Sequence, residues 1–593
     1  MSFLRLSNFH ILFVFGIFLY VLGILIFNAD RGLDVTDESF YILNAMYPFD
    51  VFSVITHENY YTGLLFYLSG YNLAIFRVFG IIVLLLSSLW FALELYKYIV
   101  EKYELNYNNN NKLYFILIIS LSSLVYYSYW LLTPSYNWLS LVAMLLTVAS
   151  MFRAINSNIK IKNRLFALEY IYLGFSLSLL FMSKPTSLLG LFPGFLFFIF
   201  FNYKKIDLIK SFISVSIVFF TLILFHIIFL DGGFSSYIYR FNESMDRISL
   251  IGGGHGIKNS LIAFYQDAKN IFKAINRYKL ATIVFVLFFI IIFLKNKNKL
   301  LSLFIYLFIF LFGILLYKLN VIPFSVNEKI YLQILIFSFF VILIYFFIED
   351  SMKERLKIFF NSFLLFLFLS YLSLAVSFGT GNNIWFHSGI AYFFPVAALM
   401  SFVFIFDKYH SMIKNMKIVV GILISLSVIT VINNAYKNPY RLNTSVKEQT
   451  EKVDLLGGIK VDEQQKIYID SILNSKRINL NTNENIYLID TTGATPGANV
   501  ILGAKFFGQS WLLGGYKGSN EFAYRILSSI SYDKLKKAWV LTSPNGSTNL
   551  DLNLFNKLGL KFPEDYDKVT TLFLNSRNEI QELWKPKEIF NDK

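Results

Sequence analysis

The sequence predicts a polytopic α-helical membrane protein with a soluble α/β domain at its C-terminal end. Hydrophobic residues occupy 56% of the 593 positions and charged residues only 15%, whereas soluble chains carry about 25% charged residues. The apolar residues form long blocks, and Lys and Arg gather in the short connections between them. The net charge of +15 therefore reflects membrane topology, and we expect no nucleic-acid partner. The absence of cysteine excludes disulfides, thiolate catalysis and Cys-ligated metals.

The apolar blocks of residues 1–433 predict about thirteen membrane spans, because a spanning helix needs roughly 20 mostly apolar residues. The first block is interpreted as a retained helix, since bulky Phe27 stands where cleavage of a signal peptide requires a small residue. Several blocks are shorter than the ideal length. The approximate limits are residues 9–27, 74–93, 113–131, 138–152, 167–182, 187–202, 211–230, 279–294, 300–317, 331–348, 358–378, 389–406 and 418–433.

The connections between these blocks alternate between basic and nearly uncharged. Because cytoplasmic loops are enriched in Lys and Arg, the pattern predicts a cytoplasmic N-terminus and an external tail, in a plasma (inner) membrane. The two long external connections are residues 28–73 and 231–278. The basic connections contain Lys97, Lys102 and Lys112, then Arg153, Lys160, Lys162 and Arg164, then Lys204, Lys205 and Lys210, then Lys295, Lys297 and Lys299, then Lys353, Arg355 and Lys357, and finally Lys408, Lys414 and Lys417.

The tail, residues 434–593, is predicted to be a small external α/β domain. Segments 485–490 and 537–542 are typical of short buried strands, and each is followed by turn-forming residues at 491–497 and 543–546. Segments 521–530 and 551–558 have the composition of helices. Strands that alternate with helices favour an α/β arrangement.

An acidic cluster follows the first span directly. Asp34, Asp37 and Glu38 fall within five positions, at the predicted outer membrane surface, where charged residues tend to be functional. Another interpretation is the start of an interfacial helix, with Asp34 or Thr36 as the N-cap and Glu38 in the first turn. The two interpretations are compatible, because a helix N-terminus can also present a catalytic carboxylate.

Several short motifs follow one another on the predicted external side. They are Asp37-Glu38 with Phe40-Tyr41, Tyr60-Tyr61-Thr62-Gly63, Arg77 followed by Gly80, Tyr136-Asn137-Trp138, and Lys184-Pro185-Thr186. Their order resembles the GT-C superfamily of glycosyltransferases, which use polyprenyl-phosphate-linked sugars and include the protein O-mannosyltransferases and the lipid A aminoarabinose transferases. The resemblance covers the whole chain but identifies no subfamily, and its specificity comes from the order and the common external side of the motifs.

The resemblance implies inverting transfer of a sugar from a polyprenyl-phosphate-linked donor to an external glycan, lipid or protein acceptor. Asp37 is then the base that takes a proton from the acceptor hydroxyl, and Glu38 orients Asp37 or the acceptor. The transition state resembles an oxocarbenium ion, and negative charge builds up on the departing phosphate. Cations beside that phosphate are therefore expected.

Four basic residues are candidate donor phosphate ligands, and each has a structural alternative. Arg77 could be an interfacial anchor, and Lys184 could be a snorkelling lysine at a helix end. Arg240 and Arg247 would share one helix face, unless neighbouring acids neutralise them. The candidate ligands are Arg77, Lys184, Arg240 and Arg247.

Polar residues on the external side are candidate contacts for the acceptor or the sugar. Glu58 could hold the acceptor or support a metal, or be an ordinary loop charge. No dense His/Asp cluster with metal-ligand spacing is visible, and although nearby carboxylates could hold a hard cation, we expect no metal cofactor. The candidate contacts are Asp34, Glu58, Tyr61, Asn137, Asn383 and His387.

A transporter, a flippase or a polysaccharide polymerase is the rival interpretation. Transporters usually carry charged or broken helices at mid-bilayer and repeated halves. Here the spans are nearly free of charge, and the charged residues collect on the external side. This distribution favours chemistry at the outer surface, where a polymerase would also act.

Overall fold

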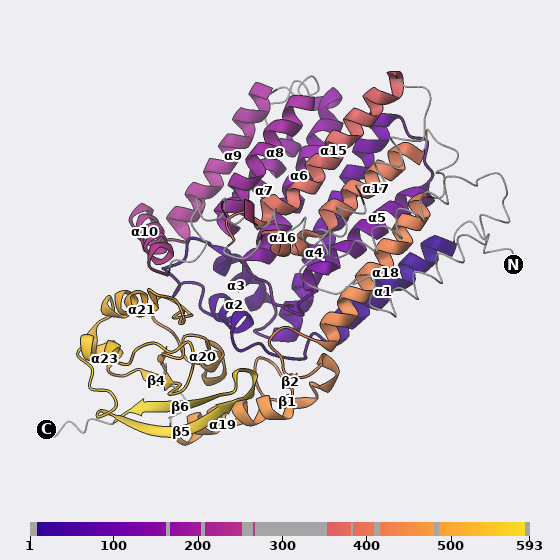
Figure 1. Ribbon diagram of the computed structural model, residues 1–593. Coiled ribbons are helices and arrows are strands. Elements are labelled where there is room, and N and C mark those ends of the chain that lie inside the picture. Colours follow the sequence, from indigo (N-terminus) through magenta and orange to yellow (C-terminus); the bar gives the residue numbers. More distant parts are fainter. Residues whose placement is uncertain are drawn as a thin grey trace.

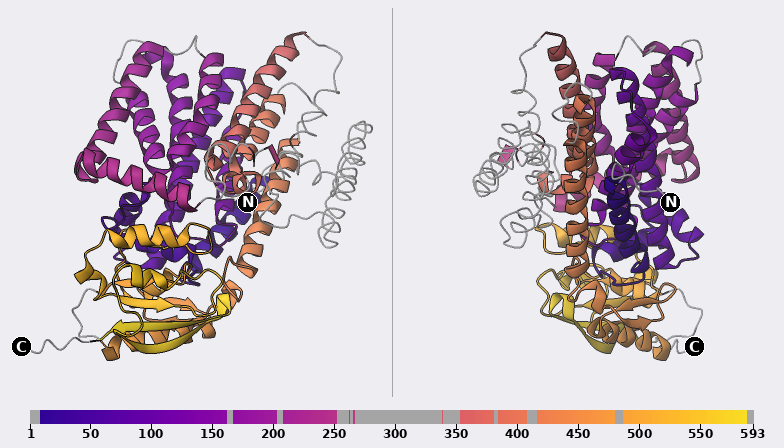
Figure 2. Two further views of the ribbon diagram at one scale, coloured as in Figure 1. Left: turned by 60° about the vertical axis from the view of Figure 1, so that its left-hand side comes forward. Right: turned by 90° about the vertical axis from the view of Figure 1, so that its right-hand side faces the viewer.

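A bundle of long apolar helices carries a smaller α/β unit at one end (Figures 1 and 2). The computed structural model describes residues 9–161, 167–202, 208–251, 262, 265–266, 338, 353–380, 384–407, 416–479 and 486–587. The bundle comprises α1 (Phe9–Phe27), α4 (Leu73–Tyr103), α5 (Asn109–Ser123), α6 (Tyr136–Ile161), α7 (Leu168–Ser183), α8 (Pro185–Asn202), α9 (Leu208–Phe229), α15 (Lys353–Ser377), α17 (Phe393–Asp407) and α18 (Met416–Lys437).

Each of these helices coincides with a predicted span, which confirms a polytopic helical architecture. Six of them, α1, α4, α6, α9, α15 and α18, are long and apolar enough to cross a membrane, and α7, α8 and α17 are shorter apolar helices. The predicted spans 279–294, 300–317 and 331–348 lie outside the described residues. The total of about thirteen crossings therefore stays a prediction.

The helix α4 extends ten residues beyond the predicted limit of 93 and ends at Tyr103. The extension carries charged residues but remains helical, because Leu95, Tyr98 and Ile99 bury one of its faces. The ion pair of 2.9 Å between Glu94 and Lys97 adds a small contribution. Glu104 then terminates the helix in the left-handed conformation, with φ of 51°.

The predicted external connections meet at the end of the bundle that carries the tail. Leu73 N donates to Leu456 O at the start of α4. Between α5 and α6, Tyr129 O accepts from Tyr440 N of the tail, and His57 N donates to Met182 O near the end of α7. These predicted external connections therefore lie at the same end of the bundle. Which end of the bundle faces outward stays a prediction.

Short helices lie between the bundle and the tail (Figure 1). The connection 28–73 contains α2 (Asp37–Met46) and α3 (Glu58–Leu68), and α10 (Phe234–Ile251) follows α9. The helix α16 (Ile384–His387) follows α15, and a 3₁₀ turn at Ser388–Ala391 leads into α17. These elements position the candidate site.

The tail has the α/β arrangement predicted for it. Its main sheet has the order β3-β4-β6-β5, in which β3 and β4 are parallel and the other pairs antiparallel. The predicted strands and helices appear as β3, β4, α21 and α23. The elements are β1 (Glu451–Val453), β2 (Ile459–Val461), α19 (Glu463–Asn479), β3 (Leu488–Asp490), α20 (Gly497–Leu502), α21 (Ser519–Ser528), α22 (Tyr532–Leu535), β4 (Trp539–Thr542), α23 (Asn553–Lys557), β5 (Tyr566–Leu574) and β6 (Glu579–Pro586).

The tail and the connection 28–73 share one hydrophobic core. Val35 and Ile42 belong to the same buried cluster as Ile469 and Leu541 of the tail. Gly497 N donates to Val35 O at 2.8 Å, and a Cβ on Gly497 would lie 2.7 Å from the Val35 Cβ. The connection 28–73 therefore packs with the tail, whereas the bundle helices form a hydrophobic cluster of their own.

Candidate functional site

Asp34 fixes the start of α2. Its Oδ1 accepts from Thr36 N at 3.0 Å, and its Oδ2 accepts from Asp37 N at 2.9 Å and Glu38 N at 3.2 Å. Burial, followed by the nearby Asp37 carboxylate, raises the pKa of Asp34 to about 7. Because its Oδ2 binds the first two N–H groups of α2, Asp34 caps the helix although Thr36 occupies the N-cap position, and its expected contact with an acceptor stays a prediction.

Glu38 and Arg77 form a buried ion pair beneath this helix start. Arg77 Nη2 lies 2.8 Å from Glu38 Oε1, with 2% and 3% of the two side chains exposed. Thr133 Oγ1 donates to the same oxygen at 2.6 Å. The second Glu38 oxygen accepts from Asp34 N at 3.1 Å. Both Glu38 oxygens are thus engaged within the protein.

The prediction that Arg77 binds donor phosphate at a water-accessible surface is corrected by these contacts. Its Nε and Nη2 donate to Glu38. The remaining donors reach carbonyls of the segment before α2, those of Ala29, Arg31 and Gly32. All five N–H groups of the guanidinium therefore have partners, so Arg77 positions this segment instead.

Asp37 differs from its two acidic neighbours because 24% of its side chain is exposed. Its Oδ2 lies 2.9 Å from Arg441 Nη1, and burial, followed by the nearby Asp37 carboxylate, raises the pKa of Tyr440. Arg441 stacks over the Tyr440 ring at 4.8 Å and has φ of 56°, a conformation that is uncommon outside glycine. Sequence analysis missed Arg441; its signal is an Arg that directly follows an aromatic residue just after the last span.

Aromatic and charged side chains surround Asp37 on the bundle side. Tyr41 lies edge-on to Tyr136, with ring centroids 6.0 Å apart. Burial raises the pKa of Tyr41, and Tyr136, Asp37 and Glu58 add to the effect. Asn137 directly follows Tyr136 in α6 and therefore lies beside this group. The structure thus gathers Asp37, Tyr41, Glu58, Tyr136 and Asn137 from three segments.

Glu58 is a buried side chain and not an ordinary loop charge. It begins α3 and is 2% exposed. Asn44 Nδ2 donates to its Oε1 at 3.2 Å, and Asn44 in turn accepts from Ser510 of the tail at 2.6 Å. Burial raises the pKa of Glu58. Its Oε2 is buried without a hydrogen-bond partner, so this oxygen is available to a ligand.

Arg240 and Arg247 both belong to α10, as expected for residues on one helix. The neighbouring acids do not neutralise them, because Glu243 and Asp246 pair with Arg525 of α21. Arg247 lies over the Phe522 ring at 5.4 Å. Burial lowers the pKa of Arg247 to about 10, against the influence of Tyr136, Glu58 and Tyr516. Arg247 is therefore close enough to Tyr136 and Glu58 for their charges to affect it.

Lys184 and His387 form a second group of side chains, near the junction where α7 ends and α8 begins. Lys184 Nζ donates to Val376 O at 2.9 Å. His387 Nε2 is buried without a partner, and burial, followed by Lys184, lowers the pKa of His387 to about 3. The two predicted residues are thus neighbours, and Asn383 lies outside the described residues.

A cluster of histidine, aspartate and tyrosine that sequence analysis missed surrounds Arg240. Asp231 lies 2.9 Å from His57 Nε2 and 3.4 Å from Arg240 Nε. Tyr61, a predicted sugar contact, stacks on His226, with ring centroids 6.0 Å apart. His57 and Asp231 are 174 positions apart. The sequence therefore gives no spacing signal for this cluster, which forms only in the folded chain, and the expectation that the protein holds no metal cofactor stays a prediction.

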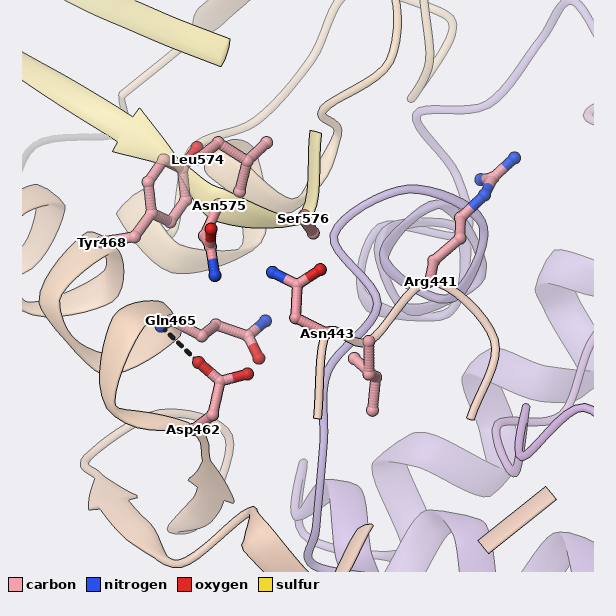
Figure 3. A pocket seen from close by; sticks show the side chains of 9 residues that line it. Arg441, Asn443, Asp462, Gln465, Tyr468, Leu574, Asn575 and Ser576 are labelled. Atoms are coloured by element: carbon pink, nitrogen blue, oxygen red, sulfur yellow. Dashed lines mark hydrogen bonds between the residues drawn. The ribbon is translucent and has the colours of Figure 1, made fainter. Parts of the chain in front are cut away.

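A small pocket of the tail lies beside Arg441 (Figure 3). Its empty volume, open solvent included, is about 280 Å³. Asn443, Asp462, Gln465 and Asn575 line it, and the Arg441 guanidinium points away from them. Asp37 does not line this pocket, so it is separate from the acidic group.

Comparisons with known proteins give distant similarities to solved structures only. No family model and no curated protein matches the chain. Among solved structures, the chain is similar to the oligosaccharyltransferase of Archaeoglobus fulgidus, crystallised with a disulfide-tethered acceptor peptide that contains the NVT sequon. The TM-score is 0.44 with 11% identity, over 90% of this chain and 69% of that chain.

Proposed function

We propose that the protein is a membrane glycosyltransferase that moves a sugar from a polyprenyl-phosphate-linked donor to an external acceptor, with inversion at the anomeric carbon. The observation that carries the proposal is Asp37. It is a partly exposed carboxylate in an otherwise buried acidic group, at a helix N-terminus between the bundle and the tail. A fixed carboxylate that solvent and substrate can reach is what a general base requires.

The neighbours of Asp37 support this role by holding it in place. Asp34 binds the N–H groups at the start of α2, and Glu38 ties α2 to Arg77 of α4. A base held by buried contacts keeps its position as the acceptor binds, which preserves the geometry for proton transfer. In this proposal Asp34 and Glu38 are positioning residues, and Asp37 alone takes the proton.

Cations near Asp37 would stabilise the departing phosphate. Arg441 contacts Asp37, and 37% of its side chain is exposed. We assign it to the phosphate together with Arg247 of α10, which lies near Tyr136 and Glu58. On donor binding, Arg441 would leave Asp37 and pair with the donor phosphate. Asp37 would then be free to accept a proton. Lys184 remains a third candidate, since its ammonium has one carbonyl partner.

Sugar transfer by the full-length protein in nanodiscs tests the proposal. Synthetic polyprenyl-phosphate sugars would serve as donors, and a membrane extract of the native host as the source of acceptor. Asp37→Asn is nearly isosteric but removes the proton acceptor. We expect transfer to fall by about 10²–10⁴-fold, with donor binding retained.

Asp30→Asn is the matched control. Asp30 lies in the same connection and pairs with Lys460 at 2.6 Å, and its side chain is 27% exposed, close to the value for Asp37. We expect near-normal transfer by this variant. Full activity of Asp37→Asn would exclude Asp37 as the base. If the unmodified protein moved lipid-linked sugars without breaking the bond to phosphate, a flippase or transporter would replace the enzyme.

A further inference from the structure

Three metal-binding side chains converge at one point outside the Asp37 group. They are His57 at the N-terminus of α3, His226 in α9 and Asp231 between α9 and α10. One ligand atom of each lies within 4.8 Å of the others. The three residues come from the connection 28–73 and from the α9–α10 corner, so the cluster joins two parts of the chain.

The two oxygens of Asp231 have different surroundings. Oδ1 accepts from the Tyr60 hydroxyl at 3.2 Å and lies 3.4 Å from Arg240 Nε. Oδ2 points toward His57 Nε2 at 2.9 Å. Carboxylates that bind a metal are commonly held by hydrogen bonds from outer groups, and Tyr60 and Arg240 can hold Oδ1 in this way while Oδ2 faces His57.

The surroundings of His226 give a second, independent indication of a metal site. It is 2% exposed, and both Nδ1 and Nε2 are buried without a hydrogen-bond partner. Its ring stands edge-on to His57, with ring centroids 4.7 Å apart, and Tyr60 and Tyr61 pack against it. Leaving a buried polar group unpaired is costly, and coordination of an ion at the cluster would satisfy one of these nitrogens.

We propose that His57, His226 and Asp231 bind one divalent transition-metal ion, with Zn²⁺ as the probe of choice. Two imidazoles and one carboxylate suit Zn²⁺ or a similar ion better than Mg²⁺ or Ca²⁺, which prefer oxygen ligands. Tetrahedral coordination at about 2.0–2.2 Å places ligand atoms roughly 3.3 Å apart. A small rotation of the rings from the present arrangement reaches that spacing.

Three protein ligands leave a fourth position for water or a substrate oxygen. Arg240 lies behind the carboxylate and offsets part of its charge, so the site would bind the ion less tightly than an isolated His₂Asp set. The ion would link two parts of the chain: the connection 28–73, which contains Asp37, and the corner between α9 and α10. Binding does not depend on the proposed transferase activity and can be measured without a donor or an acceptor.

The experiment uses the full-length protein in detergent, stripped with EDTA, dialysed against Zn²⁺ and analysed for metal content. We expect one tightly held Zn²⁺ per chain, and a visible absorption band of tetrahedral character when Co²⁺ replaces it. His226→Ala should lower the affinity at least about 100-fold, the upper range for loss of an outer-shell partner. Asp231→Asn should weaken binding while keeping an oxygen for Tyr60 and Arg240.

The control is His10→Ala. His10 lies in α1, edge-on to Tyr114, and we expect this variant to keep wild-type stoichiometry. Size-exclusion elution reports whether each variant is folded. If His226→Ala does not fold, Asp231→Asn still tests the site. Absence of retained metal in the wild-type protein, or equal affinity in both site variants and the control, would overturn the proposal.

Discussion

The buried pair of Glu38 and Arg77 allows a sharp prediction about stability. Glu38→Gln keeps the size of the side chain but removes the negative charge that faces the guanidinium. Glu38 Oε1 accepts from Arg77 at 3.1 and 2.8 Å and from Thr133 at 2.6 Å. The variant therefore leaves a cation buried in a site that was built around an anion.

The expected loss of folding free energy follows from the burial of the Glu38–Arg77 ion pair. Removing one member of a buried ion pair costs about 3–5 kcal/mol, because the remaining charge is desolvated without compensation. The amide oxygen of Gln can still accept one N–H, and the carbonyls of Ala29, Arg31 and Gly32 remain in place. We therefore expect the lower end, about 3 kcal/mol, which is roughly a hundredfold in the folded-to-unfolded ratio.

The assay is unfolding by SDS in mixed micelles, followed by circular dichroism. Glu94→Gln is the matched control, because Glu94 is also buried, at 4% exposure, but its partner Lys97 is 50% exposed. A solvated lysine tolerates loss of its partner, so the control should cost about 1 kcal/mol or less. Arg77→Met combined with Glu38→Gln should be less destabilising than the sum of the single variants. The reasoning fails if Glu38→Gln is as mild as Glu94→Gln, or if the double variant is additive.

Three further predictions concern the donor, the shared core and the topology. Arg441→Ala should weaken binding of a polyprenyl phosphate about tenfold to a hundredfold, as expected for a charge-assisted contact, whereas Arg525→Ala should not; equal binding would remove Arg441 from the site. Gly497→Val should lower the stability of the packing between the tail and the connection 28–73 by about 1–3 kcal/mol, because the new side chain would overpack against Val35. Unchanged resistance of the variant to proteolysis would contradict the shared core. Because the chain contains no cysteine, Ser528→Cys should react with an impermeant maleimide on intact cells, and Asn106→Cys only after permeabilisation. The reverse labelling would place the Asp37 group on the cytoplasmic side.

The sequence by itself determined most of the described helices of the bundle, the order of the connections and two short strands of the tail, but not its two longest strands, β5 and β6. The apolar runs at 9–27 and 418–433 reappear as α1 and α18, and segment 537–542 contains β4. These features depend on local composition, which any segment carries with it. The acidic motif was also visible, because Asp34, Asp37 and Glu38 are adjacent in the chain.

The tertiary structure decided which of these residues are accessible and what they contact. Arg77 resembled a surface cation, but the path of residues 29–32 surrounds it with carbonyls. Arg441 reaches Asp37 only because the tail folds back against α2. His57 and Asp231 meet across 174 positions. Such contacts depend on how distant segments pack, and neither composition nor spacing encodes that packing, so the buried ion pair and the His/Asp cluster became visible only in three dimensions.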